Sequence, residues 1–325
     1  MPHLGNESAR EALAAAMASG ALHHAWLIAG PEGVGKGSFA RQAATRMLAE
    51  AAGRDSLAPG WDVPESSQTA HLIGAGAHPD YRELARLPKD ADKPDEALAR
   101  SITIAQVRGL QAMFATKPSL SSRRVIVIDS IDDLERAGAN ALLKSLEEPP
   151  QGTIFLLVSH APGRLLPTIR SRCRLLRFEA LEDAQVASIL RAELPQASAS
   201  EVDALVRAGE GSPGRALGFA GLDLAALETE MAALAETGDV SNAIRSRLAK
   251  LLGAKAAQPR YEAFLDRAPS FIAERARTLS GETLRTALDA YAAARELAGA
   301  ALGLSLDASA TVFEMSGIIA RLANR

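Results

Sequence analysis

The glycine-rich segment Gly30–Ser38 carries the residues of this chain most able to do chemistry. It reads Gly-Pro-Glu-Gly-Val-Gly-Lys-Gly-Ser and matches the phosphate-binding P-loop pattern up to and including the lysine. Glycines at such a turn let backbone N–H groups point at phosphate oxygens, while the lysine brings a positive charge to the outer phosphates. The residues expected to form this cradle are Gly30, Gly33, Gly35, Lys36, Gly37 and Ser38.

The position after the lysine departs from the P-loop pattern. A serine or threonine hydroxyl normally holds Mg²⁺ there, whereas this chain has Gly37. Ser38 comes one residue later, about 100° further around a helix, so its hydroxyl cannot simply take over that role. The sequence therefore indicates descent from a P-loop protein and leaves present binding of ATP and magnesium open.

A second candidate residue is Asp129, at the end of the apolar run Arg124–Asp129. A carboxylate at the end of such a strand binds Mg²⁺ directly or through water. The next residue is Ser130, which cannot activate a water molecule as a glutamate would. Asp132 and Asp133 lie beyond the strand and are better read as turn or helix-cap residues. Defects in two separate elements thus argue against hydrolysis by this chain.

Two arginines could reach a nucleotide from outside the loop. Arg172, in Ser171-Arg172-Cys173, precedes the last expected strand and could face the nucleotide of a neighbouring subunit. A planar guanidinium can spread positive charge over γ-phosphate oxygens there. Arg215 follows a Gly-Ser-Pro-Gly turn and opens a helix that could reach back to a nucleotide. From spacing alone, an ordinary surface role is the better reading of both arginines.

These candidates need a scaffold of alternating strands and helices, and the chain up to residue 178 predicts one. Strands are expected at 24–29, 80–85, 124–129, 153–159 and 173–178. The runs at 124–129 and 153–159 are typical of strands buried on both faces of a parallel sheet. Helical patterns are expected between them at 7–19, 37–50, 104–115, 137–148 and 166–169. The alternation predicts a doubly wound α/β domain with a parallel sheet. Only 51–77 lacks clear periodicity, and an irregular connector is expected there.

Beyond residue 178 the pattern becomes wholly helical. Three short helices are expected at 183–194, 200–208 and 213–220, followed by long alanine- and leucine-rich helices. Breaks in the long helices are expected near Gly238, Pro259, Pro269 and 305–307. The predicted domains are therefore 1–178, a three-helix lid at 179–221, and an all-helical region at 222–325.

Composition narrows the class of protein further. The 325 residues are 47% hydrophobic with a net charge of -3, which argues against a globally basic nucleic-acid binder. No apolar run reaches the roughly 18 residues of a membrane helix, and the first residues lack a secretion signal. A cytoplasmic protein without membrane contact is expected. The single cysteine, Cys173, excludes an internal disulfide and reads as a small core residue.

Several segments resemble the bacterial clamp-loader subunits of DNA polymerase III. The most specific are 140–150 (Asn-Ala-Leu-Leu-Lys-Ser-Leu-Glu-Glu-Pro-Pro) and 166–173 (Leu-Pro-Thr-Ile-Arg-Ser-Arg-Cys). Shorter ones are His23–Trp26, His78–Asp80 and Ile104–Arg108. The resemblance covers about the first two thirds of the chain and is nearest to the delta-prime branch of the family, whereas the last helices match only in composition and length.

This resemblance implies an AAA+ module of two domains, followed by a helical collar used for oligomerisation. It implies a non-catalytic stator subunit in a hetero-pentamer with gamma/tau and delta subunits, which loads the sliding clamp onto primer-template DNA. Arg172 would act in trans at the ATP site of a gamma/tau-type neighbour, and Arg215 would correspond to the sensor-2 arginine. The four-cysteine zinc module of many such subunits is absent, because 51–77 contains no cysteine.

Two alternatives stay open at the level of the sequence. Lys36 keeps alive a gamma/tau-like subunit that itself binds and hydrolyses ATP. A stand-alone DNA-binding AAA+ protein is a third reading, which the acidic net charge disfavours.

Overall fold

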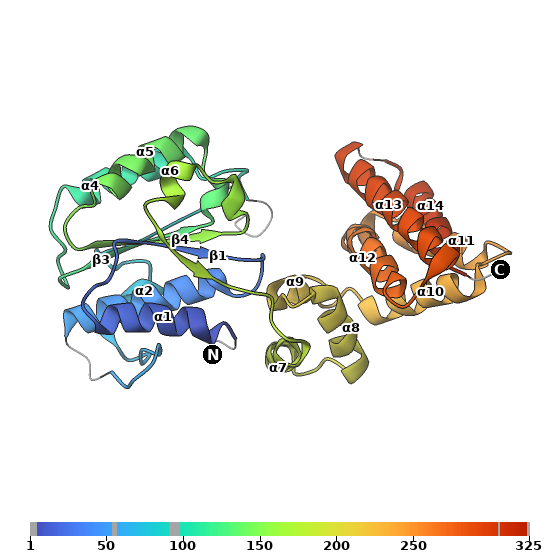
Figure 1. Ribbon diagram of the computed structural model, residues 1–325, viewed down its shortest axis with the longest axis horizontal. Helices are drawn as coiled ribbons and strands as arrows, with labels where there is room; N and C mark the ends of the chain where they lie inside the picture. Colours follow the sequence, from blue (N-terminus) through green and yellow to red (C-terminus); the bar gives the residue numbers. More distant parts are fainter. Residues whose placement is uncertain (1–4, 54–56, 91–97, 305, 324–325) are drawn as a thin grey trace. The chain divides into compact units, whose positions relative to one another are not determined.

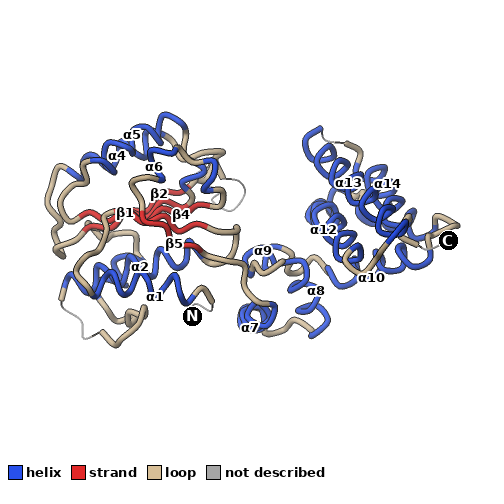
Figure 2. Tube along the Cα trace, viewed as in Figure 1, coloured by secondary structure: helices blue, strands red, loops and turns tan. Residues whose placement is uncertain are grey.

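The computed structural model describes residues 5–53, 57–90, 98–304 and 306–323 of the chain. The chain divides into two compact units, Met1–Gln185 and Val186–Arg325. Strands and helices make up the first unit, while the described elements of the second are helices (Figure 2). Within the described ranges, no helix is both long enough and apolar enough to cross a membrane.

One parallel sheet forms the centre of the first unit. Its strands, in the order of the sheet, are β2 (Tyr81–Ala85), β3 (Arg124–Asp129), β4 (Thr153–Ser159), β1 (Ala25–Ala29) and β5 (Arg174–Arg177). Every neighbouring pair runs parallel. All residues of β1 and β4, and all of β3 except its last, are buried. The expected parallel sheet is therefore confirmed, and its three central strands are covered on both faces, whereas the edge strands β2 and β5 are mostly not buried.

Helices cover both faces of this sheet. The helices on one face are α1 (Glu7–Ala18) and α2 (Lys36–Ala52), and those on the other are α4 (Ile104–Phe114), α5 (Arg136–Glu147) and α6 (Pro167–Arg170) (Figure 1). Phe39 and Met47 of α2 pack into the core on the first face, and Leu110 and Leu142 pack into the core on the second. The two cores pack on opposite faces of the sheet and fix the positions of the carboxyl ends of β1 and β3.

The segment after α2 is more ordered than its sequence suggests. It contains α3 (Gln68–Gly74), which the absence of periodicity did not predict. Buried Arg46 donates from Nη1 to the carbonyl oxygens of Ala58 and Asp62, at 2.8 and 3.1 Å. Trp61 packs edge-on against Phe39. A buried charge and one aromatic ring tie the described part of this segment to α2, and neither leaves a periodic signal.

The second unit consists of helices joined by short connections. After α7 (Asp183–Glu193), which spans the boundary, they are α8 (Ala199–Gly209), α9 (Pro213–Gly218), α10 (Leu224–Thr237), α11 (Ala243–Leu252), α12 (Gln258–Ala276), α13 (Gly281–Leu304) and α14 (Ala308–Ala320). The expected breaks at Gly238 and Pro259 are confirmed, because α10 ends before Gly238 and Pro259 lies in the first turn of α12. The expected break at Pro269 is wrong, since α12 continues through it.

Buried neighbours explain why α12 survives its proline. Ala268, Phe271 and Ile272 are buried, so the packed face outweighs one lost backbone hydrogen bond. Arg267, 1% exposed, donates to Glu228 at 2.8 Å and to both carboxylate oxygens of Glu274.

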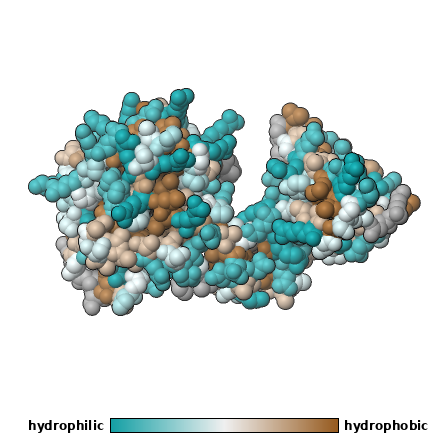
Figure 3. All heavy atoms as spheres, in the orientation of Figure 1, coloured by the Kyte–Doolittle hydropathy of each residue, from teal (hydrophilic) through white to brown (hydrophobic). Residues whose placement is uncertain are grey.

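Ion pairs also join the two sides of the predicted boundary at 221/222. Arg207 of α8 pairs with Glu228 of α10, and Arg215 of α9 pairs with Asp266 of α12. The division of the helical part into 179–221 and 222–325 stays a prediction. Hydrophilic side chains cover most of the surface visible in Figure 3, with smaller apolar patches between them.

Candidate functional site

The predicted phosphate cradle has the expected strand, loop and helix around it. The loop leaves β1 at Ala29 and enters α2 at Lys36. Gly33 and Gly35 have φ values of 75° and 92°, a region that side chains with a Cβ rarely enter. Gly30 lies against the backbone of Phe178, where an added Cβ would collide with the carbonyl group. Ser38 is exposed on α2. The cradle geometry is thus built by glycines at the predicted positions.

Lys36 is folded back into the loop. Its side chain is buried, and Nζ donates to the carbonyl oxygens of Gly30, at 2.7 Å, and Pro31. Burial lowers the pKa of Lys36 to about 8, although the carboxylates of Asp129 and Glu32 act in the opposite direction. A phosphate group would have to replace these carbonyl contacts, and it would favour the charged form of the lysine.

Gly37 is pressed against Asp129. A Cβ built on Gly37 would overlap Oδ2 of Asp129 and lie 3.0 Å from its Cγ. The carboxylate at the end of β3 therefore fills the space that a serine or threonine side chain would need. Position 37 therefore lacks the magnesium hydroxyl and also leaves no room for one while Asp129 keeps this position.

Arg41, one helical turn after Gly37, binds the same carboxylate. Its Nη2 donates to Oδ2 of Asp129 at 3.1 Å, and its Nε donates to Oε1 of Glu83 at 2.9 Å. Oε2 of Glu83 accepts a hydrogen bond from the hydroxyl of Tyr81. Burial raises the pKa of Asp129, Arg41 opposes that rise, and the charge of Glu83 adds to it. Arg41 thus forms ion pairs with two carboxylates on adjacent strands.

These residues do not fit a magnesium ion bound as in an active P-loop site. The ion would need a side-chain hydroxyl at position 37 and the carboxylate of Asp129 without a competing cation. The backbone supplies no hydroxyl, and Oδ2 of Asp129 is paired with Arg41. No chemical step at this loop is therefore assigned to magnesium.

The residues after Asp129 have structural partners. Ser130 is buried and its hydroxyl donates to Asp133 at 3.3 Å. Asp132 accepts hydrogen bonds from the backbone N–H groups of His160 and Ala161 and from the Ser159 hydroxyl, at 2.6, 3.3 and 3.0 Å. Asp132 thus caps the end of β4, which confirms a turn-stabilising role for it.

Arg172 lies two residues after α6, at the start of the connection to β5. Its Nη2 lies 2.6 Å from Oε1 of Glu147, and its Nη1 donates to the carbonyl oxygen of Thr168 at 2.8 Å. About a third of the side chain (32%) is exposed. The guanidinium is accessible from outside the first unit and rests on a carboxylate of the same chain. Its role in trans stays a prediction.

Arg215 belongs to the second unit. Ser212 caps α9 by accepting a hydrogen bond from the Arg215 N–H, which confirms the predicted turn and helix start. The guanidinium pairs with Glu210 at 2.8 Å and with Asp266 at 3.1 Å. These partners satisfy the arginine within its own unit, and contact with a nucleotide stays a prediction.

Two of the motifs that carried the resemblance hold the first unit together. His24 Nε2 lies 3.0 Å from the carbonyl oxygen of Leu146, which links the start of β1 to the end of α5. Asp80 is buried and accepts hydrogen bonds from the N–H groups of Ser119 and Leu120, each at 2.8 Å. These residues support the fold of the first unit rather than line the loop.

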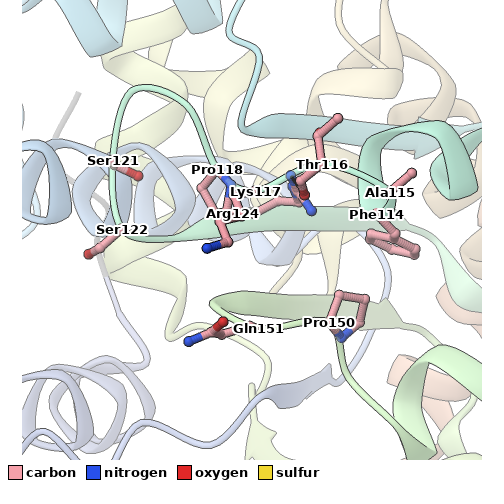
Figure 4. Close-up of a pocket in the computed structure, with 10 residues that line it drawn as sticks. All are labelled: Phe114, Ala115, Thr116, Lys117, Pro118, Ser121, Ser122, Arg124, Pro150 and Gln151. Carbon is pink, nitrogen blue, oxygen red and sulfur yellow. Dashed lines mark hydrogen bonds between the residues drawn. The ribbon is translucent and has the colours of Figure 1, made fainter.

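A pocket of about 410 Å³ lies at the opposite end of the sheet, where β3 and β4 begin (Figure 4). Its lining residues are Phe114, Ala115, Thr116, Lys117, Pro118, Ser121, Ser122, Arg124, Pro150 and Gln151. Arg124 is 1% exposed and donates from Nη2 to the Thr116 carbonyl oxygen at 3.0 Å. Burial lowers the pKa of Arg124, and the carboxylate of Asp80 opposes this effect. Arg124 therefore stabilises the wall of this pocket through its hydrogen bond to Thr116.

Sequence reasoning missed Arg41 and Glu83. The signal for Arg41 was its spacing, since residues four apart share one face of a helix and Gly37 is already a site position. Glu83 lay in an expected strand beside the one that ends at Asp129, but strand order is not written in the sequence. Their meeting at one carboxylate was therefore not predictable.

Residues 5–182 match a known protein family. The family model described as "DNA polymerase III, delta subunit" matches residues 5–182. Among curated proteins, the chain is 36% identical over 190 residues to the DNA polymerase III subunit delta' of Pseudomonas aeruginosa, covering 58% of this chain and 53% of that protein. It is 33% identical over 226 residues to subunit delta' of Escherichia coli, covering 69% of this chain and 63% of that protein.

The chain is also similar to a gamma/tau subunit and, at low sequence identity, to a solved structure. The gamma/tau subunit of Mycobacterium bovis is 33% identical over 227 residues, covering 65% of this chain and 34% of that protein. A gamma subunit-related protein of Thermotoga maritima has a TM-score of 0.45 at 16% identity, covering 95% of this chain and 98% of the other. The chain thus matches from about half to under two thirds of the length of those two delta' relatives. Because the family match takes in more than half of its residues, the chain belongs to the DNA polymerase III delta' subunit family.

Proposed function

We propose that this chain is a non-hydrolysing subunit of a bacterial clamp loader. In this role it supports the ATP-dependent loading of a sliding clamp onto primed DNA and donates Arg172 to the nucleotide of a neighbouring gamma/tau-type ATPase. The observation that carries the proposal is the contrast between two sites. Position 37 lacks the magnesium hydroxyl and Ser130 stands where a water-activating carboxylate would, whereas the Arg172 side chain is partly exposed.

The charge chemistry of Arg172 supports this assignment. An arginine finger must be partly exposed before assembly and must exchange its own partner for phosphate oxygens afterwards. Arg172 meets the first condition, with 32% of its side chain exposed, and Glu147 is the partner that it would exchange. Glu147 belongs to the Leu-Glu-Glu-Pro-Pro segment, so both parts of this pair lie in the two segments most typical of the family.

The proposed assembly is a hetero-pentamer with gamma/tau and delta subunits. In it, 1–178 and 179–221 form an AAA+ module with its lid, and 222–325 forms the collar through which subunits associate. The names of the curated relatives support partners of the clamp-loader type. Within 222–325, the buried Arg267 pairs with Glu228 of α10 and Glu274 of α12, and these ion pairs support a packed helical collar.

Reconstitution with gamma/tau and delta subunits tests the proposal. We expect Arg172→Ala to lower the ATPase rate stimulated by clamp and primed DNA, by up to about 10³-fold at the site that it completes. Arg170→Ala is the matched control, because Arg170 is an exposed arginine of the same segment with one long hydrogen bond of 3.5 Å to Pro162. Co-purification with the partners should survive both changes. An unchanged stimulated rate in Arg172→Ala would remove the finger from the proposal.

The alternative is a gamma/tau-like subunit that itself hydrolyses ATP. Two observations favour it, namely the intact Lys36 and the similarity to gamma/tau proteins over 65% of the chain. The isolated chain decides between the two. Turnover of ATP that is abolished by Lys36→Ala would support the ATPase, whereas no turnover in the unmodified chain supports the non-hydrolysing role.

A further inference from the structure

An arginine of α2 pairs with Asp129, the carboxylate that the P-loop pattern would assign to a metal ion. The side chain of Arg41 reaches from α2 to the end of β3 and to β2, where it binds Asp129 and Glu83. The carboxylate of Asp129 is the ligand that Mg²⁺ would need, and its Oδ2 is the oxygen that Arg41 binds. Arg41 and a metal ion would therefore compete for the same carboxylate.

The glycine at position 37 makes this arrangement feasible. A side chain there would overlap Oδ2 of Asp129 and approach Nη1 of Arg41 to 3.4 Å. The missing side chain at position 37 thus leaves room for both the Asp129 carboxylate and the Arg41 guanidinium.

One guanidinium joins the two carboxylates. Nε of Arg41 lies 2.9 Å from Oε1 of Glu83, and its Nη2 lies 3.1 Å from Oδ2 of Asp129. Two carboxylates that face each other without a cation would repel, and such pairs attract divalent ions. Arg41 neutralises them by direct pairing, although 46% of its side chain is exposed.

We propose that Arg41 is the resident cation of this loop and excludes divalent metal ions from the Asp129–Glu83 pair. The loop is then independent of magnesium, and any phosphate-bearing ligand that enters it meets Lys36 and Arg41 rather than a metal complex. This inference deepens the proposed non-hydrolysing role and rests on it. Its test concerns metal binding by the isolated chain, so its failure is separate from failure of the Arg172 experiment.

Mn²⁺ alone is the probe, because its EPR signal reports the free ion during titration of the full-length chain. We expect the unmodified chain to bind Mn²⁺ weakly at this site. Arg41→Ala and Arg41→Met should bind it at least about tenfold more tightly, since the carboxylate pair is then released. Arg41→Lys keeps a positive charge there and should stay close to the unmodified chain. The Met variant preserves much of the packed stem if the Ala variant folds poorly.

Two controls locate the ion. Arg247→Ala removes an arginine of similar exposure that pairs with Glu230 in the second unit, and it should leave Mn²⁺ binding unchanged. Asp129→Asn combined with Arg41→Ala should abolish the gain. The inference is overturned if the unmodified chain already binds Mn²⁺ through Asp129 as tightly as the Arg41 variants. It is equally overturned if folded Arg41→Met gains no affinity, or if the gain survives Asp129→Asn.

Discussion

Arg172 and Glu147 form an ion pair between the ends of two helices, with 2.6 Å between Nη2 of the arginine and Oε1 of the glutamate. Glu147 is the last residue of α5, and Arg172 follows α6 by two residues. Both side chains are partly exposed, so the pair contributes little to stability, about 1 kcal/mol or less. The pair holds the guanidinium against the end of α5, so a phosphate group would have to displace Glu147.

The first prediction concerns this pair. Glu147→Gln removes the charge that holds Arg172 and should change the free energy of unfolding by less than about 1 kcal/mol. In the reconstituted clamp loader we expect the stimulated ATPase rate to be unchanged or higher, because the arginine no longer has to leave a carboxylate. A fall as large as that of Arg172→Ala would mean that Glu147 orients the finger rather than restrains it.

The second prediction concerns Gly37. Gly37→Ser restores the residue type of an active P-loop, yet it should lower the free energy of unfolding by about 1–3 kcal/mol, since its Cβ overlaps Asp129. Urea denaturation measures the change. Gly109→Ser on α4 is the control, because a Cβ there meets open space. Equal stability of the two variants would contradict the close packing of Gly37 on Asp129.

The third prediction concerns Asp132, which caps the end of β4 with three hydrogen bonds. Asp132→Ala leaves two backbone N–H groups without their acceptor and should cost about 1–3 kcal/mol of stability. Asp203→Ala, at an exposed position of α8, should cost less than about 0.5 kcal/mol. Chemical denaturation compares them. An effect of Asp132→Ala no larger than that of the control would show that the cap contributes nothing.

The fourth prediction follows from the pKa of Lys36. Burial lowers it to about 8 in the folded chain, whereas an unfolded lysine titrates at about 10.4. Between these values the unfolded state binds the extra proton, so the free energy of unfolding rises with pH. The penalty for burying the charged amine is thus fully present below pH 8 and is relieved as pH increases.

Measured stabilities of the unmodified chain and Lys36→Met should therefore diverge with pH. From pH 7 to 9.5 the unmodified chain should gain up to about 2 kcal/mol relative to the variant. Lys144→Met, which alters an exposed lysine of α5, should show no such trend. A difference between the unmodified chain and Lys36→Met that stays constant over this range would show that the pKa of Lys36 is not lowered.

Much of the scaffold could be predicted from the sequence because local patterns specify it. Continuous apolar runs located β1, β3 and β4, since strands covered on both faces need apolar residues throughout. The spacing of the P-loop glycines also identified the turn into α2, because positive φ values restrict the residue type. The helix across Pro269 and the order in 57–74 were mispredicted, since both depend on buried contacts with distant residues.

The sequence by itself determined that the loop lacks its magnesium hydroxyl at Gly37 and that Ser130 stands in place of a base. Only the tertiary structure decided what fills the space. The parallel order β2-β3-β4-β1-β5 places Glu83 beside Asp129, and one turn of α2 brings Arg41 to both. The side chains of Arg41, Glu83 and Asp129 form ion pairs because the sheet and α2 fix the distances between them. The spacing of these residues along the sequence does not encode those distances.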